Sequence, residues 1–164
     1  MLRLALATVF MIAPGVAQAS TVASALPDAE LRGAAVLRFL GFPVYEARLF
    51  TRSGTSLDWS TDFAIELTYL RNLSEQELVE STMRELDRTG GALPLRDQLE
   101  RCYVDVRKGD RYLAVSEGQD RVGFWLNGKR VCTLGHPQIK TRFMSIFLGD
   151  NTRSPSFTRK LKGE

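Results

Sequence analysis

The sequence has little of the chemistry that most enzyme active sites use. Its 164 residues include one histidine and two cysteines, and His136 has no carboxylate or cysteine at metal-ligand spacing. No serine lies in a Gly-x-Ser-x-Gly turn, which positions a hydrolase nucleophile. Gly90-Gly91 follows a helical pattern rather than a strand, so it does not predict a phosphate-binding loop. We therefore expect no metal ion or other cofactor.

Runs of one charge, internal repeats and interdomain linkers are also missing. The 22 Lys and Arg residues and 19 Asp and Glu residues give a net charge of +3. These charges are interspersed and form no basic stripe with interleaved aromatics, so we expect no nucleic acid partner. The length and the absence of linkers predict a single domain.

The first nineteen residues have the pattern of a secretory signal peptide. Arg3 precedes a nearly continuous apolar run from Leu4 to Val16, and Ala17-Gln18-Ala19 is a small-x-small cleavage site. We expect cleavage after Ala19, a periplasmic or secreted domain over residues 20–164, and no stable membrane anchor after cleavage. The alternative is an uncleaved amino-terminal anchor, although the run is short for a membrane span.

A strand followed by a helix is the clearest local pattern. Apolar residues at 63, 65, 67 and 69 alternate with smaller or more polar residues, which predicts a half-buried strand. Ser74 and Glu77 form a capping-box signature at the start of a helix. The apolar positions of this helix, at three- and four-residue spacing, are Leu78, Val79, Thr82, Met83 and Leu86. Gly90-Gly91 is expected to end it.

Strands and helices alternate in blocks along the rest of the chain. We expect strands over about 34–40 and 43–51, a helix over 93–102, and a meander of strands between 104 and 134 with a tight turn at Asn127-Gly128. One helix is expected with Pro137 one or two residues inside its start, and a last short helix is expected to start at Ser154-Pro155 and to end around Leu161. This order predicts an α+β domain, an antiparallel sheet with helices gathered on one face.

The two cysteines have apolar neighbours in the sequence. Cys102 and Cys132 lie in segments that read as largely buried. A disulfide is chemically permitted outside the cytosol. Because its geometry is demanding, and because nothing in the sequence shows that the two residues approach each other, we expect free buried thiols instead.

Five segments in a fixed order resemble the secreted bacterial branch of the chalcone isomerase-like family. They are LRFLGFPVYEARLF (37–50), FAIELTYLRNLS (63–74), VDVRKGDRY (104–112), FWLNGKRV (124–131) and IKTRFMSIFLGDNTRSPSFTRKLKG (139–163). The resemblance extends over residues 33–163. It implies an open-faced β-sandwich, in which a large antiparallel sheet and a helical layer enclose a ligand cleft.

The resemblance also implies which positions of the chain would carry chemistry. Plant enzymes of the family use an arginine and a Tyr-Lys-Asn set on the helix after the central strand, and that set falls here at Leu78, Ser81 and Glu85. A polar threonine of their cleft falls near Leu40. Other members resemble fatty-acid-binding proteins and hold a carboxylate with an arginine and a tyrosine. The missing set favours the second kind of member.

Arg71 is the leading candidate ligand residue, because it continues the apolar face of the central strand. A guanidinium there could hold a carboxylate, with Tyr69 as a second donor. The alternative is a solvated arginine paired with Glu75 or Glu77, with Tyr69 in the core. Arg38, on a neighbouring strand, is a further candidate.

We therefore expect a non-catalytic protein that binds a small apolar or fatty-acid-like ligand. One alternative is an isomerase (an intramolecular lyase of the chalcone isomerase type) with a non-standard catalytic set. The other is a structural or interaction protein whose cleft is filled by side chains.

Overall fold

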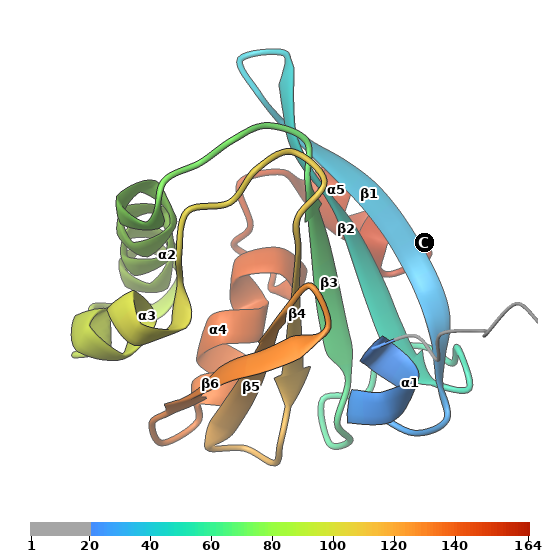
Figure 1. The fold of residues 1–164 in the computed structure, drawn as a ribbon. Helices are drawn as coiled ribbons and strands as arrows, with labels where there is room; N and C mark the ends of the chain where they lie inside the picture. The colour runs from blue at the N-terminus through green and yellow to red at the C-terminus, as the bar shows by residue number, and fades with distance from the viewer. Residues whose placement is uncertain (1–20) are drawn as a thin grey trace, which may run out of the picture.

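Within residues 21–164, the part of the chain that the computed structural model describes, six strands form one antiparallel sheet (Figure 1). Their order in the sheet is their order in the sequence. The strands are β1 (Ala29–Phe39), β2 (Phe42–Arg52), β3 (Ala64–Tyr69), β4 (Arg111–Ser116), β5 (Arg121–Leu126) and β6 (Lys129–Gly135). The expected signal peptide and its cleavage site lie outside the described residues.

Four of the helices cover one face of this sheet. They are α2 (Glu75–Gly90), α3 (Arg96–Cys102), α4 (Ile139–Leu148) and α5 (Pro155–Leu161). Helix α2 packs on α3 and α4, α3 packs on β6, and α5 lies against β1 and β2. The α+β, open-faced architecture expected from the sequence is therefore present. No helix in this part of the chain combines the length and apolarity needed to cross a membrane.

The opposite face carries a smaller apolar cluster. The short helix α1 (Thr21–Ala25) inserts Val22 there against Ala64, Leu113 and Val115. A five-residue helix is not stable in isolation, so this packing must hold it in place. No local pattern predicts α1, because its segment contains mainly small residues with neither a capping signature nor a helical apolar period.

The strand and helix at the centre of the sequence form where the pattern predicts. On β3, Ile65 and Tyr69 are buried in the main core on the helix side. The backbone N–H of Glu77 donates to Ser74 Oγ at 3.2 Å, and a Glu77 carboxylate oxygen accepts from the backbone N–H of Ser74 at 2.7 Å, which completes the capping box. Helix α2 ends at Gly90, as predicted.

Several boundaries differ from the expectation. Strand β1 begins at Ala29, five residues early, because its first residues pair with the end of β2 (Ala29 with Arg52). Helix α3 begins at Arg96 rather than 93, so Pro94 precedes the helix.

The end of α5 crosses β1 at very close range. A β-carbon added to Gly33 would lie 2.5 Å from the carbonyl oxygen of Leu161 and 2.6 Å from that of Lys160. The Arg32 side chain donates from Nε to the Lys162 carbonyl at 2.9 Å. Glycine at position 33 therefore permits the last helix to dock on the first strand.

A candidate ligand cavity with an arginine at its opening

A cavity of about 760 Å³ lies between the sheet and the helical layer. Its volume falls within the range of about 300–1,000 Å³ common for small-molecule sites. The sheet contributes side chains from β1 to β5, and the opposite wall comes from α2, α4 and the segment leading into α5. Because the cavity is open, the alternative of a cleft filled by side chains loses its support.

Aromatic rings form much of the lining. All four tyrosines of the sequence take part, and they are Tyr45, Tyr69, Tyr103 and Tyr112. Their rings meet edge to face in a chain with centroid separations of 6.3, 6.3 and 5.5 Å. Edge-to-face contacts favour a defined ring orientation, so this wall is apolar and well ordered.

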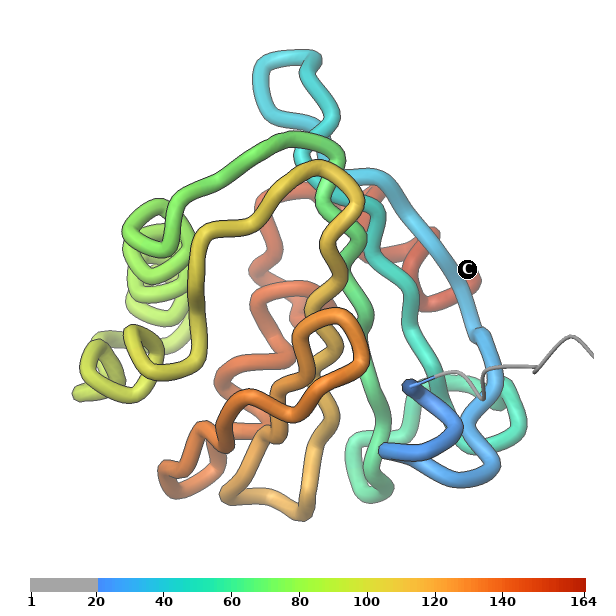
Figure 2. Tube along the Cα trace, in the orientation of Figure 1, coloured from blue at the N-terminus to red at the C-terminus, as the bar shows by residue number. Residues whose placement is uncertain are grey.

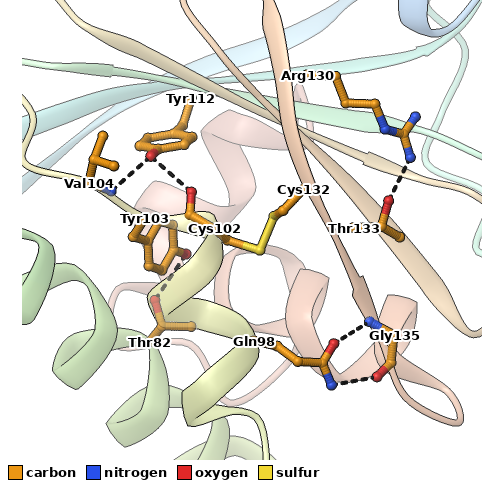
Figure 3. The surroundings of a disulfide bond; sticks show 10 residues. All are labelled: Thr82, Gln98, Cys102, Tyr103, Val104, Tyr112, Arg130, Cys132, Thr133 and Gly135. Atoms are coloured by element: carbon orange, nitrogen blue, oxygen red, sulfur yellow. Dashed lines mark hydrogen bonds between the residues drawn. A yellow bond between two sulfur atoms is a disulfide. The ribbon is translucent and has the colours of Figure 1, made fainter.

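Two of the four tyrosine hydroxyls are committed to the fold. The Tyr112 hydroxyl donates to the Cys102 carbonyl at 3.0 Å and accepts from the Val104 N–H at 3.2 Å (Figure 3). The Tyr103 hydroxyl is 3.2 Å from the hydroxyl of Thr82. These bonds hold the segment after α3 against β4.

The hydroxyls of Tyr45 and Tyr69 have no hydrogen bond to any described residue. Every side-chain polar atom in residues 21–164 that is fully shielded from solvent has a hydrogen-bond partner. Because these two hydroxyls have none, neither is fully shielded, and both face the cavity that their rings line. Burial raises the pKa of each far above its usual value, with a smaller contribution at Tyr45 from the charge of Glu85. Both phenols are therefore protonated at neutral pH and available as donors to a ligand.

Arg71 lies where the cavity meets solvent, because it is exposed and also contributes to the lining. Among the described residues no acid lies within 4 Å of its guanidinium. Glu77 is engaged in the capping box instead, and the backbone and hydroxyl of Ser74, with a smaller effect of Arg71, lower the pKa of its carboxyl. The alternative considered from the sequence was an ion pair of Arg71 with Glu75 or Glu77, and neither pair forms among the described residues.

A second group of charges in the wall is already neutralised. The Glu85 carboxylate accepts from Arg88 at 2.7 and 3.0 Å and contacts Arg153. Burial raises the pKa of Glu85, but hydrogen bonds from the two arginines outweigh it and the pKa is lowered. Because Glu85 stays ionised and paired, Arg153 is not available to a ligand anion. Arg84 also lines the cavity and has no ion pair within the described residues.

The positions expected to correspond to the enzymatic set do face the cavity. Leu78, Ser81 and Glu85 all line it. Leu78 is apolar, the Ser81 hydroxyl donates to the Leu78 carbonyl at 3.1 Å, and Glu85 is held by its two arginines. None of the three offers a free donor to an oxyanion.

Arg38 and Leu40 do not line the cavity. On β1 the residues that face the helices have odd numbers, as buried Ala35 and cavity-lining Leu37 show. Arg38 is not among the lining residues. Its Nη1 donates to the Gly41 carbonyl at 3.2 Å, and its side chain borders a smaller pocket beside α5. Across the turn at Leu40-Gly41, Arg38 pairs with Pro43 of β2, and neither residue lines the cavity.

A disulfide joins Cys102 of α3 to Cys132 of β6, with Cα atoms 5.2 Å apart (Figure 3). The expectation of free thiols is wrong. The side-chain amide of Gln98 adds two bonds to the same strand, donating to the Gly135 carbonyl at 3.0 Å and accepting from its N–H at 2.9 Å. Helix α3 is thus fixed to the sheet at the end of the helical wall.

Groups that would suggest other chemistry are not gathered anywhere in residues 21–164. No three His, Cys, Asp or Glu side chains come together there as a metal site would require. His136 is outside the cavity lining, and its Nδ1 lies 3.0 Å from the Pro137 carbonyl.

No protein-family model matches the sequence, and no curated protein matches it in sequence. Among solved structures, the fatty-acid binding protein of Arabidopsis thaliana superposes with a TM-score of 0.63 over 84% of this chain and 88% of that one. The chain has a chalcone isomerase-like fold. The identity to the plant protein is 11%, so the fold is shared while the residues of the site are this chain's own.

Proposed function

We propose that this chalcone isomerase-like domain binds a fatty acid or a similar apolar carboxylate without transforming it. The observation that carries the proposal is an apolar, tyrosine-lined cavity whose opening holds Arg71, an arginine with no ion pair to any residue of 21–164. The acyl chain would lie along the aromatic wall, and Arg71 would hold the carboxylate through charge-assisted hydrogen bonds. The likeness to a plant fatty-acid binding protein supports the same class of ligand.

Tyr69 belongs to this site as a second donor, on the face of the strand that leads to Arg71. Its free, protonated hydroxyl can donate to a carboxylate but cannot neutralise it. Tyr45, which pairs with Tyr69 across the two strands, offers the same chemistry. Sequence reasoning missed it because its neighbours on the same face of the strand, Pro43 and Ala47, are uncharged. Arg38 takes no part, since it lies outside the lining.

The decisive experiment compares two ligands that differ only in the head group. Affinities for a saturated fatty acid and for the fatty alcohol of equal chain length are measured by calorimetry. In Arg71→Ala we expect about 10- to 100-fold weaker binding of the acid and unchanged binding of the alcohol. Arg101→Ala, an exposed arginine of α3 outside the cavity, is the matched control.

An equal loss for acid and alcohol would show that Arg71 shapes the cavity rather than holding the head group. If Arg84→Ala, and not Arg71→Ala, gave the selective loss, the head-group site would move to α2. Turnover of a chalcone above its spontaneous rate would contradict the non-catalytic proposal altogether.

The same proposal includes export to the periplasm or the exterior, with cleavage after Ala19. The signal-like amino terminus supports it, and so does the disulfide, because disulfides persist mainly in oxidising compartments. Amino-terminal sequencing of the protein recovered from its cells should begin near Ser20. A sequence that begins at Met1 would contradict the cleavage.

A further inference from the structure

The turn between β1 and β2 is an exposed apolar tip. Phe39, Leu40 and Phe42 are 61, 81 and 70% exposed, and the hairpin projects beyond the loops beside it (Figure 2). Single exposed apolar residues are ordinary on a protein surface. Three within four residues at a protruding point indicate a surface that contacts something else.

The conformation of the turn does not explain these residues. Leu40 and Gly41 have φ values of 49° and 83°, and such two-residue turns favour asparagine or aspartate followed by glycine. The left-handed conformation of Leu40 is unfavourable for leucine, and its side chain makes little apolar contact because it is 81% exposed. The hairpin would fold at least as well with a polar tip, so the apolar side chains need another reason.

The apolar surface of the tip continues into the ligand cavity. Phe39 is exposed at the tip and also lines the cavity, and Leu37 and Val44 follow it inward on the two strands. The segment that carries Arg71 is joined to the same hairpin, because the Leu70 N–H donates to the Val44 carbonyl at 2.9 Å. The tip, the arginine and the opening of the cavity therefore belong to one end of the molecule.

The charge of the hairpin fits the surface of a phospholipid membrane. Between Glu30 and Glu46 the chain contains no acid. Of the two arginines in this stretch, Arg32 donates to the Lys162 carbonyl at the far end of β1, and Arg38 lies at the base of the apolar tip. An arginine below inserted apolar side chains can reach the lipid phosphates. The neighbouring loop from 105 to 110 contains two acidic and two basic residues, so it does not oppose an attraction between Arg38 and lipid phosphates.

From this geometry we infer that the tip of the β1–β2 hairpin docks reversibly on a phospholipid bilayer, with Leu40 and Phe42 inserted among the lipids. Docking brings the cavity opening to the membrane surface. The inference does not depend on the proposed fatty-acid function, because docking is measured without any fatty acid present. Binding of this kind uses a few apolar side chains and not a spanning helix.

The test uses the protein recovered from cells that express the full chain, with vesicles of phosphatidylcholine and phosphatidylglycerol. Because Leu40 and Phe42 do not line the cavity, Leu40→Ser with Phe42→Ser leaves the proposed ligand site intact. We expect partition into vesicles to fall on the order of 100-fold. The control, Leu31→Ser with Val131→Ser, removes two apolar side chains that are 53 and 42% exposed elsewhere and should change partition by less than about threefold.

A second variant reports insertion directly. In Leu40→Trp the added fluorescence should shift to the blue with vesicles and be quenched by brominated lipid. Emission typical of water in the presence of bound vesicles would overturn the inference. Equal partition of the tip variant and of its control variant into vesicles would also overturn it. A wild-type dimer that dissociates in the tip variant would overturn it as well, because the tip would then be a contact between two copies of the chain. Loss of fatty-acid affinity in Arg71→Ala leaves these outcomes unchanged.

Discussion

At the scale of single residues, Gly33 is the point where backbone meets backbone. An alanine there would press its β-carbon against two carbonyls of α5 that cannot move independently of the helix. We expect Gly33→Ala to lower the free energy of unfolding by about 1–3 kcal/mol, measured by urea denaturation. Gly135→Ala, with nothing within 4 Å of the added carbon, should have a much smaller effect. Equal effects would contradict the close crossing.

The tyrosines of the cavity divide into structural and free hydroxyls, and this difference is testable. Tyr112→Phe leaves the Cys102 carbonyl and the Val104 N–H without their partner, so it should destabilise the fold by about 1–2 kcal/mol. Tyr69→Phe breaks no side-chain hydrogen bond among residues 21–164, so it should leave stability within about 0.5 kcal/mol while weakening carboxylate binding. Urea denaturation and calorimetry measure the two effects, and the opposite pattern would reverse the assignment.

The candidate site could be predicted from the sequence only where a residue follows the regular pattern of its strand. Tyr69 was placed on the correct face because β3 alternates without interruption. Arg38 was named as a candidate although it lies outside the cavity lining, because its strand reverses at a turn two residues later and the strand pattern cannot be followed through that turn. The free hydroxyl of Tyr45 could not be predicted, since the absence of a partner depends on side chains from other elements.

At the scale of elements, α3 attaches the helical layer to the sheet, because it packs on both α2 and β6. The disulfide closes a segment of 30 residues between α3 and β6, which on chain-entropy grounds stabilises the fold by about 3–4 kcal/mol. We expect Cys102→Ala with Cys132→Ala to lose about this amount in guanidinium denaturation. Reductant should destabilise the wild type and leave the double variant unaffected. An unchanged stability in the double variant would show that Gln98 and the core hold α3 without the disulfide.

Elements differed in how far their sequences predict them. Helix α2 was predicted closely, because its capping box and its glycine stop are local signals. Helix α1 exists only through the contact of Val22 with the outer face of the sheet. The disulfide was missed for the same kind of reason, since the distance between its cysteines is set by the docking of α3 on β6.

At the scale of the whole molecule, the four tyrosines make stability sensitive to alkali. Burial is the main cause that raises the pKa of all four, to about 12 for Tyr103. A pKa that is raised in the folded state adds stability below the unfolded value of 10.0, and this contribution is lost as pH rises through the folded values. Melting temperature should therefore fall steeply above pH 10.

Ultraviolet absorbance of the phenolate, followed beside circular dichroism, checks this prediction. We expect phenolate to form together with unfolding and not before it. Phenolate that forms near pH 10 in a protein with native circular dichroism would show that the rings are open to solvent.

The neighbour relations of the last strands were predicted at this scale, as a meander between 104 and 134, because tight turns such as Asn127-Gly128 join strands that must pair. The size of the cavity was not predictable. It depends on how far α2 stands from the sheet, which is set by its packing on α3 and α4 and not by any pattern within α2.

The docking of α5 on β1 joins the two ends of the described chain. Synthesis produces the first strand well before α5, so β1 and its hairpin partner lack the cover of this helix until residues 155–161 have been made. Because Phe157 and Leu161 of α5 are buried in the main core, the core beside Gly33 closes late in folding. Removal of α5 would leave that apolar surface open to other chains.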